Sequence, residues 1–172
     1  MKRKSATASG DQMLVHCTML DYLSNLRTEE AKRMQRTTGI PQKGWHLGTV
    51  AKKKTLIGQA EEFKATFPEC VVLLRVGEFF EAFGVDAVLV VDICHTGFKG
   101  VGTSIPARSI QSRLDMLVAA GWKCAMFEET SVCVQPRYRM FAQLVSDAAP
   151  IYLKAPIHAA AADDVPEEKP IV

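Results

Sequence analysis

The stretch "CVVLLRVGEFFEAF", residues 70–83, decides the fold. Its first part, a run that is apolar except for Arg75, is typical of a central strand covered on both faces. Gly77 then interrupts the run and indicates a bend or a close approach of the backbone. Beyond the glycine, Phe79 and Phe80 stand between two glutamates. This ending leaves two interpretations open: a strand that continues into the core, or a strand that presents one aromatic ring to a ligand.

The alternation of side chains along a strand separates the two rings. Successive side chains point to opposite faces, so Phe79 and Glu81 are expected on one face and Phe80 on the other. One ring can then join the core while the other stands exposed, with a carboxylate two residues further along the chain. We therefore predict that Phe79 faces outward and Phe80 inward.

The segments around this stretch predict helices and further strands. A helix is predicted where apolar residues recur with helical spacing, and a strand where short apolar runs lie between turns. The predicted helices are residues 11–39, 55–67 and 107–120, and the further strands are residues 122–129 and 137–145. Residues 84–95 fit either a helix or a strand, and residues 97–106 read as a glycine-rich turn region. This order predicts an α/β (α+β) fold, a mixed β-sheet with packed helices and an N-terminal helical extension.

The charges are distributed unevenly along the 172 residues. Residues 1–54 carry a net charge of +7, residues 55–153 carry −3 and residues 154–172 carry −2. We predict a basic extension with one amphipathic helix and a linker (1–54), a folded domain (55–153) and a disordered acidic tail (154–172). The basic extension suits a polyanion, although solvated charge runs explain it equally well.

Composition and motifs exclude several classes of protein. No run of 18 apolar residues could span a membrane, and single cysteines without a C-x-x-C pair favour a reducing, intracellular compartment and no metal site. Neither a phosphate-binding G-x-x-x-x-G-K-[ST] loop nor a G-x-S-x-G nucleophile motif is present, so we expect no enzyme and no cofactor. One catalytic alternative stays open, a metal-dependent nuclease, which would need several carboxylates to converge. The candidates are Glu78, Glu81, Asp86, Glu128 and Glu129.

Two blocks of the sequence resemble a known family. The segment "LLRVGEFFEAFGVDA" (73–87) resembles the N-terminal mismatch-recognition domain of the MutS family, in which a strand delivers a Phe-x-Glu motif to DNA. The segment "SIPARSIQSRLDMLVAAGWKCAMFEET" (104–130) is similar to the second block of that domain. The resemblance covers residues 55–153 and implies the fold of MutS domain I. The segments "LLRVGEF" and "RYRMFAQLVSDAAPIYL" resemble most the organelle-targeted homologues, so we expect a mitochondrion or plastid, with the nucleus as the alternative.

The resemblance implies roles for individual residues. Phe79 would wedge into the minor groove and stack on a mispaired base, and Glu81 would hydrogen-bond an edge of that base. A wedge must unstack a base step, which is easier where pairing is already faulty. The neighbouring residues would flank the wedge or contact the DNA backbone. These are Arg75, Val76, Gly77, Lys99 and Arg108.

The resemblance predicts a DNA-binding module for double-stranded DNA with mispairs. The sequence contains none of the connector, lever, clamp and ATPase domains of complete MutS proteins, so we expect no ATPase in this chain acting alone. The alternative is a structural protein, in which the same fold serves as a subunit of a larger complex, possibly organellar, and DNA binding is lost. A protein partner would then bind through residues 11–36, provided that their apolar stripe is left uncovered by the domain.

Overall fold

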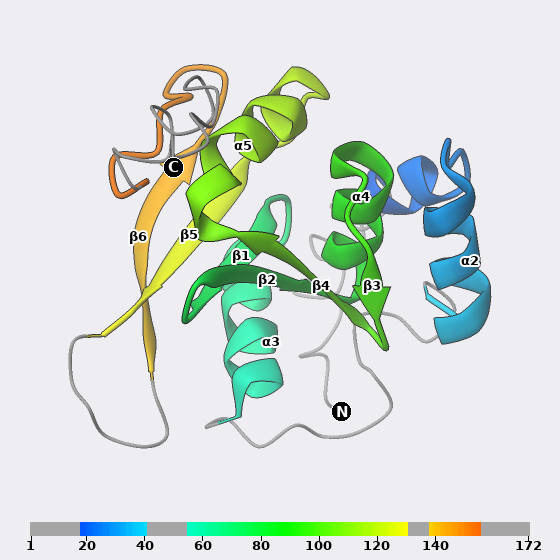
Figure 1. Ribbon diagram of the computed structural model, residues 1–172, viewed down its shortest axis with the longest axis horizontal. Coiled ribbons are helices and arrows are strands. Elements are labelled where there is room, and N and C mark those ends of the chain that lie inside the picture. Colours follow the sequence, from blue (N-terminus) through cyan, green and yellow to red (C-terminus); the bar gives the residue numbers. More distant parts are fainter. Residues whose placement is uncertain (1–17, 41–54, 131–137, 156–172) are drawn as a thin grey trace, which may run out of the picture.

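A six-stranded mixed sheet forms the centre of the protein (Figure 1). The computed structural model describes residues 18–40, 55–130 and 138–155. The strands lie in the order β3-β4-β2-β1-β5-β6, with β1 and β5 parallel and the other neighbours antiparallel. Their bounds are β1 Val71–Val76, β2 Phe79–Phe83, β3 Phe98–Lys99, β4 Gly102–Pro106, β5 Cys124–Glu129 and β6 Arg139–Val145. The predicted mixed sheet, and the predicted strands β1, β5 and β6, are confirmed.

Helices pack against this sheet as predicted. In Figure 1, α4 and α5 lie on one side of strands β2 and β4, and α3 lies on the other. The helices are α2 Glu29–Thr38, α3 Leu56–Thr66, α4 Gly84–Cys94 and α5 Ile110–Ala119, and a short 3₁₀ helix, Ala107–Ser109, precedes α5. No helix in the described residues is long and apolar enough to cross a membrane. Cys70, Cys94 and Cys124 are free thiols buried in the core.

The ambiguous residues 84–95 form helix α4. Nearly all of its side chains are buried, because neighbouring elements surround it. Apart from Asp86 and Asp92, α4 is apolar on all sides and therefore lacks the periodicity that would reveal a helix in the sequence. The glycine-rich segment is also more ordered than a turn: β3 and β4 form a hairpin, with Phe98 paired to Thr103 and Lys99 to Gly102. It is more regular than predicted because β4 pairs with the open edge of β2.

The helix predicted for residues 11–39 is broken. In its described part, residues 18–23 are helical, the helix is interrupted before Thr28, and α2 then runs to Gly39, whose φ of 71° ends it as predicted. The interruption lies where the Asp92 carboxylate of α4 accepts hydrogen bonds from the backbone N–H groups of Arg27 (2.9 Å) and Thr28 (2.8 Å). A helix cannot continue through donors that bond elsewhere, and Thr28 instead caps α2.

The apolar side chains of the extension lie in the same core as the sheet. They are Met19, Leu23, Leu26, Ala31, Met34 and Ile40, all at most 8% exposed. The stripe that would have bound a protein partner through residues 11–36 is therefore, along its described part, covered by the chain itself. The predicted linker (39–54) falls mostly, and the predicted tail (154–172) likewise mostly, outside the described residues.

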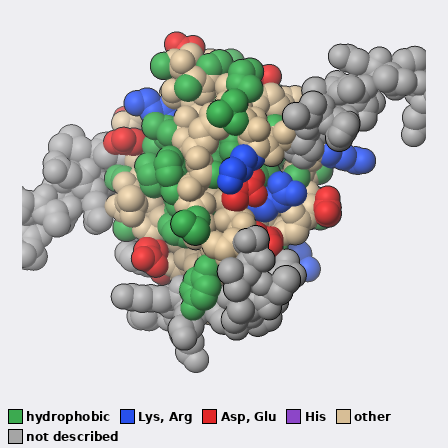
Figure 2. Space-filling model, turned by 90° about the vertical axis from the view of Figure 1, so that its left-hand side faces the viewer, with side chains coloured by type: hydrophobic (Ala, Val, Ile, Leu, Met, Phe, Trp, Pro, Cys, Tyr) green, Lys and Arg blue, Asp and Glu red, His purple; other side chains and the backbone are tan. Residues whose placement is uncertain are grey.

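Exposed apolar side chains gather instead on the edge strand β6 and the segment that follows it. Met140 is 65% exposed, Phe141 49%, Ile151 59% and Leu153 81%. Figure 2 shows this side of the molecule, where apolar side chains lie around a group of acidic and basic ones. An edge strand with exposed apolar side chains is a surface on which another chain can pair.

Candidate nucleic-acid interface

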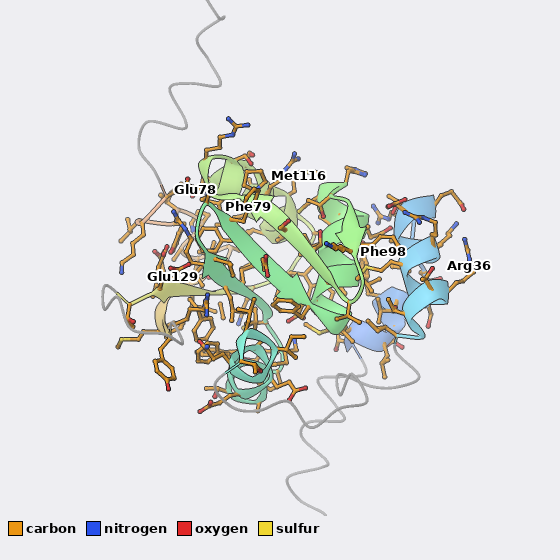
Figure 3. All side chains as sticks on the ribbon, turned by 60° about the horizontal axis from the view of Figure 1, so that its bottom comes forward. Arg36, Glu78, Phe79, Phe98, Met116 and Glu129 are labelled. Carbon is orange, nitrogen blue, oxygen red and sulfur yellow. The ribbon has the colours of Figure 1, made fainter. Side chains whose placement is uncertain are left out.

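A two-residue hairpin presents the first phenylalanine. Val76 of β1 pairs with Phe79 of β2, so Gly77 and Glu78 alone form the turn. Gly77 has a φ of 59°, a conformation that glycine adopts without the steric cost of a Cβ. The predicted bend is therefore a complete reversal of the chain. Figure 3 shows Glu78 and Phe79 together at this end of the sheet.

The two rings point to opposite faces, as predicted. The Phe79 side chain is 44% exposed, whereas Phe80 is fully buried. The Phe80 ring meets the buried ring of Tyr152 edge-on, with 5.9 Å between the centroids. The Tyr152 hydroxyl in turn donates to the Glu128 carboxylate. The segment after β6 thus completes the core around Phe80 and leaves Phe79 outside it.

The register of the strands extends the face that carries Phe79. Residues paired across neighbouring strands share a face, so Glu81 lies beside Ser104 of β4, and Phe79 beside Pro106. Further along, Lys99 of β3 shares this face through its pairing with Gly102. Four residues of strand separate Phe79 from that end, which is about 13 Å at roughly 3.3 Å per residue. We call this surface, made of Phe79, Glu81, Lys99, Ser104 and Pro106, the wedge face.

A groove runs along the wedge face on the side of Glu81. Its volume is about 870 Å³, and its lining includes Ile57, Glu81, Phe98, Lys99 and Ser104. Partial burial raises the pKa of the Glu81 carboxyl above its ordinary value by desolvation, and the positive charge of Arg139 opposes this shift. Glu81 is therefore easier to protonate than a fully solvated glutamate and can both accept and donate hydrogen bonds.

The flanking residues predicted from the sequence divide into two groups. Lys99 and Arg108 are exposed, at the far end of the wedge face and just beyond Pro106 respectively. Arg75 instead turns toward its own chain: its Nε donates to the Gly77 carbonyl (2.5 Å), and its guanidinium lies 5.3 Å from the centre of the Phe80 ring. The structure therefore places Arg75 on the face opposite Phe79, away from any ligand of the wedge face.

Val76 and Ser104 are the cross-strand neighbours of Phe79 and Glu81. Val76 pairs with Phe79, lies beside it on the same face and is half-buried. Ser104 is exposed directly across from Glu81, and sequence reasoning missed it. No local signal could have found it, because its position depends on the register between β2 and β4.

The carboxylates of the nuclease alternative do not converge. Asp86 is buried on α4 and forms a 2.8 Å ion pair with Lys64. Glu128 and Glu81 belong to opposite faces of the sheet, since Glu128 bonds Tyr152 beneath Phe80. Within the described ranges, no group of three or more His, Cys, Asp or Glu side chains is arranged to hold a metal ion.

Comparisons with known proteins agree with this architecture. The family model described as MutS domain I matches residues 54–146. The DNA mismatch repair protein MutS of Flavobacterium johnsoniae is 34% identical over 89 residues, which are 46% of this chain and 10% of that protein. The mitochondrial DNA mismatch repair protein MSH1 of Arabidopsis thaliana is 34% identical over 77 residues, 40% of this chain and 7% of that protein. The chain thus spans about a tenth of these relatives or less.

Proposed function

Because the chain belongs to the MutS domain I family, we propose that it is a DNA-binding module that recognises mispaired duplexes with Phe79 and Glu81. The observation that carries the proposal is the opposition of the two rings, with Phe79 exposed at the end of a hairpin and Phe80 buried behind it. An exposed ring on a short turn has the shape of a wedge, and the buried ring fixes the strand beneath it.

The wedge reads deformability rather than sequence. An aromatic ring stacked on a base contributes about 1–3 kcal/mol whichever base it is. Inserting the ring costs the unstacking of a base step, and this cost is lowest where pairing is already faulty. Phe79 would therefore enter a mispaired site more readily than a matched one.

Glu81 would test the base that the wedge displaces. It lies two residues after Phe79 on the same face, and its side chain lines the groove. A carboxylate repels phosphates but accepts a hydrogen bond from a base N–H, and a protonated carboxyl donates one to a base acceptor. Ser104, directly across the strand pair, adds a hydroxyl that can do both.

The relatives matched here are complete repair proteins, of which this chain covers a small part. The proposed function therefore concerns only the recognition of DNA by the region that matches MutS domain I, residues 54–146. The MSH1 relative is named as mitochondrial, which supports a proposed location in an organelle. A fluorescent fusion imaged with organelle markers tests that location.

Competition binding tests the function directly. Two duplexes that differ in a single mispair are compared at a fixed salt concentration, since affinities for DNA depend steeply on salt. The proposal requires tighter binding to the mispaired duplex. Equal affinity for both would instead favour a structural role, and the exposed apolar side chains of β6 would then be the surface that docks onto a larger complex.

The raised pKa of Glu81 predicts that DNA binding depends on pH. Its pKa is raised in the folded protein, so any stability that this carboxyl contributes is fully present below the ordinary carboxyl pKa and lost as the pH rises through the folded value. DNA binding should follow the same direction: as the pH falls from neutral toward the range where Glu81 protonates, repulsion from phosphates disappears and affinity rises. Glu81→Gln, which is permanently neutral, should bind matched DNA more tightly at neutral pH and show a flatter pH profile. A profile unchanged by that substitution would contradict the role of Glu81.

Lys99 predicts a change in salt dependence. Replacing Lys99 with alanine should weaken binding to matched and mispaired duplexes alike, because a phosphate contact carries no information about pairing. The slope of log affinity against log salt should become shallower by about 0.9 for one lost contact. Lys123→Ala removes the same charge from an exposed position before β5, four strands from β3, and should leave the slope unchanged. A lower preference for the mispair in Lys99→Ala would instead assign this lysine to recognition.

A further inference from the structure

We propose that Glu129 and Arg75 are positioning residues that hold the hairpin carrying Phe79 in the geometry needed for recognition. The inference rests on the proposed function and goes beyond it, since neither side chain is one of the five that make up the wedge face: Glu129 shares the face of Phe79 by strand register but lies two strands away. Arg75 turns away from that face, and Glu129 lies on a different strand, β5, at the same end of the sheet as Glu78 and Phe79 (Figure 3).

Both polar groups of Gly77 are bound by charged side chains. Its N–H donates to Oε1 of Glu129 at 2.5 Å, although the two residues are 52 positions apart in the sequence. Its carbonyl accepts from Nε of Arg75 at 2.5 Å. Hydrogen bonds in which one partner is ionised are roughly twice as strong as those between neutral groups. The residue that starts the turn is thus held by two hydrogen bonds, one from Arg75 of β1 and one to Glu129 of β5.

Further contacts connect the hydrogen-bonded turn to the neighbouring strands of the sheet. Nε of Arg139 donates to the Arg75 carbonyl at 2.6 Å, and its Nη2 lies 3.9 Å from Glu129. On the other side of the hairpin, the N–H of Ala107 donates to the Glu78 carbonyl at 2.8 Å. Strands β1, β5 and β6 therefore hold one side of the turn, and the segment after β4 holds the other.

A wedge needs such support. Unstacking a base step costs a few kcal/mol, so the duplex exerts an opposing force on the inserted ring. A two-residue turn has few hydrogen bonds of its own and would be displaced by this force. The displacement would lower the difference in binding free energy between mispaired and matched sites. A site held within about 0.5 Å by its surroundings keeps that difference. Gly77 comes two residues before Phe79, so fixing its peptide groups fixes the ring.

The test compares Glu129→Ala with Glu129→Gln. Both variants remove the negative charge, so both should bind every duplex somewhat more tightly. Only the glutamine keeps an oxygen that accepts from the Gly77 N–H. The readout is the ratio of affinities for mispaired and matched duplexes. We expect this ratio to fall about tenfold in the alanine variant, as for the loss of one hydrogen bond to a charged group, and to be recovered in part by glutamine, whose neutral hydrogen bond is about half as strong.

Hydrogen exchange at the Gly77 amide measures, without DNA, how well the hydrogen bond to Glu129 protects this amide. This amide should exchange slowly in the wild type and in Glu129→Gln, and faster in Glu129→Ala, with thermal melts showing whether each variant is folded. Should the alanine variant fail to fold, Arg75→Met supplies the second case, since it keeps the stem over Phe80 but loses the donor to Gly77, and it should lower the ratio in the same way.

The outcomes separate this inference from the proposed function. A wild type that prefers mispaired DNA, with an unchanged ratio in whichever of these two variants folds, overturns the positioning role alone. A wild type without any preference overturns both. A ratio that falls equally in the alanine and glutamine variants assigns the effect to charge, and this too overturns the role of the hydrogen bond.

Discussion

Phe79→Ala should remove the preference for mispaired over matched DNA and leave the free energy of unfolding almost unchanged. The ring is 44% exposed, so its truncation opens no cavity in the core. Stacking of a base on an aromatic ring contributes about 1–3 kcal/mol, and a difference of about 1.4 kcal/mol is tenfold in affinity. The preference should therefore fall by roughly tenfold or more.

Tyr138→Ala is the matched control for this result. Tyr138 is 45% exposed, as Phe79 is, but it lies beside β6 and outside the wedge face. Competition binding and thermal melts of the two variants should show lost preference only for Phe79→Ala, and nearly unchanged melting for both. If Phe79→Ala unfolds the domain, the ring belongs to the core and the structural-subunit alternative gains support.

Phe80→Ala should have the opposite effect. The ring is fully buried, packs edge-on against Tyr152 and lies across the strand pair from Ile105. Truncating a buried phenylalanine costs about 3–5 kcal/mol, because apolar contacts are lost and a cavity remains. Chemical denaturation should show this loss. Phe80→Leu leaves a smaller cavity and should cost less.

Binding separates this variant from a change at the interface. At a temperature where Phe80→Ala remains folded, its ratio of affinities for mispaired and matched duplexes should stay close to that of the wild type, since Phe79 is intact. A variant that melts like the wild type but loses the preference would show that Phe80, and not Phe79, meets the DNA.

The basic extension has to be tested by substitution rather than by deletion. Residues 18–40 contribute Met19, Leu23 and Met34 to the common core, and their removal would expose that core to water. Lys32 pairs with Glu29 and Arg33 with Glu30 on α2, and the net charge of +7 for residues 1–54 already counts these four residues.

The sequence by itself determined the features that depend on near neighbours in the chain. The run of residues 70–76, apolar except for Arg75, predicted β1. Helical spacing and a following stop predicted α3 and α5, and period-two alternation placed Phe79 and Phe80 on opposite faces. Each of these follows from the geometry of a single helix or strand, so a local pattern is enough to reveal it.

Only the tertiary structure decided what depends on partners far away in the chain. It made residues 84–95 a helix by surrounding them, and it joined the break before α2 to Asp92, 64 residues beyond Thr28. It also turned Arg75 inward and brought Ser104 and Glu129 to the hairpin strands. These placements follow from strand register and from hydrogen bonds between residues far apart in the sequence, and no periodicity within one segment records such pairings.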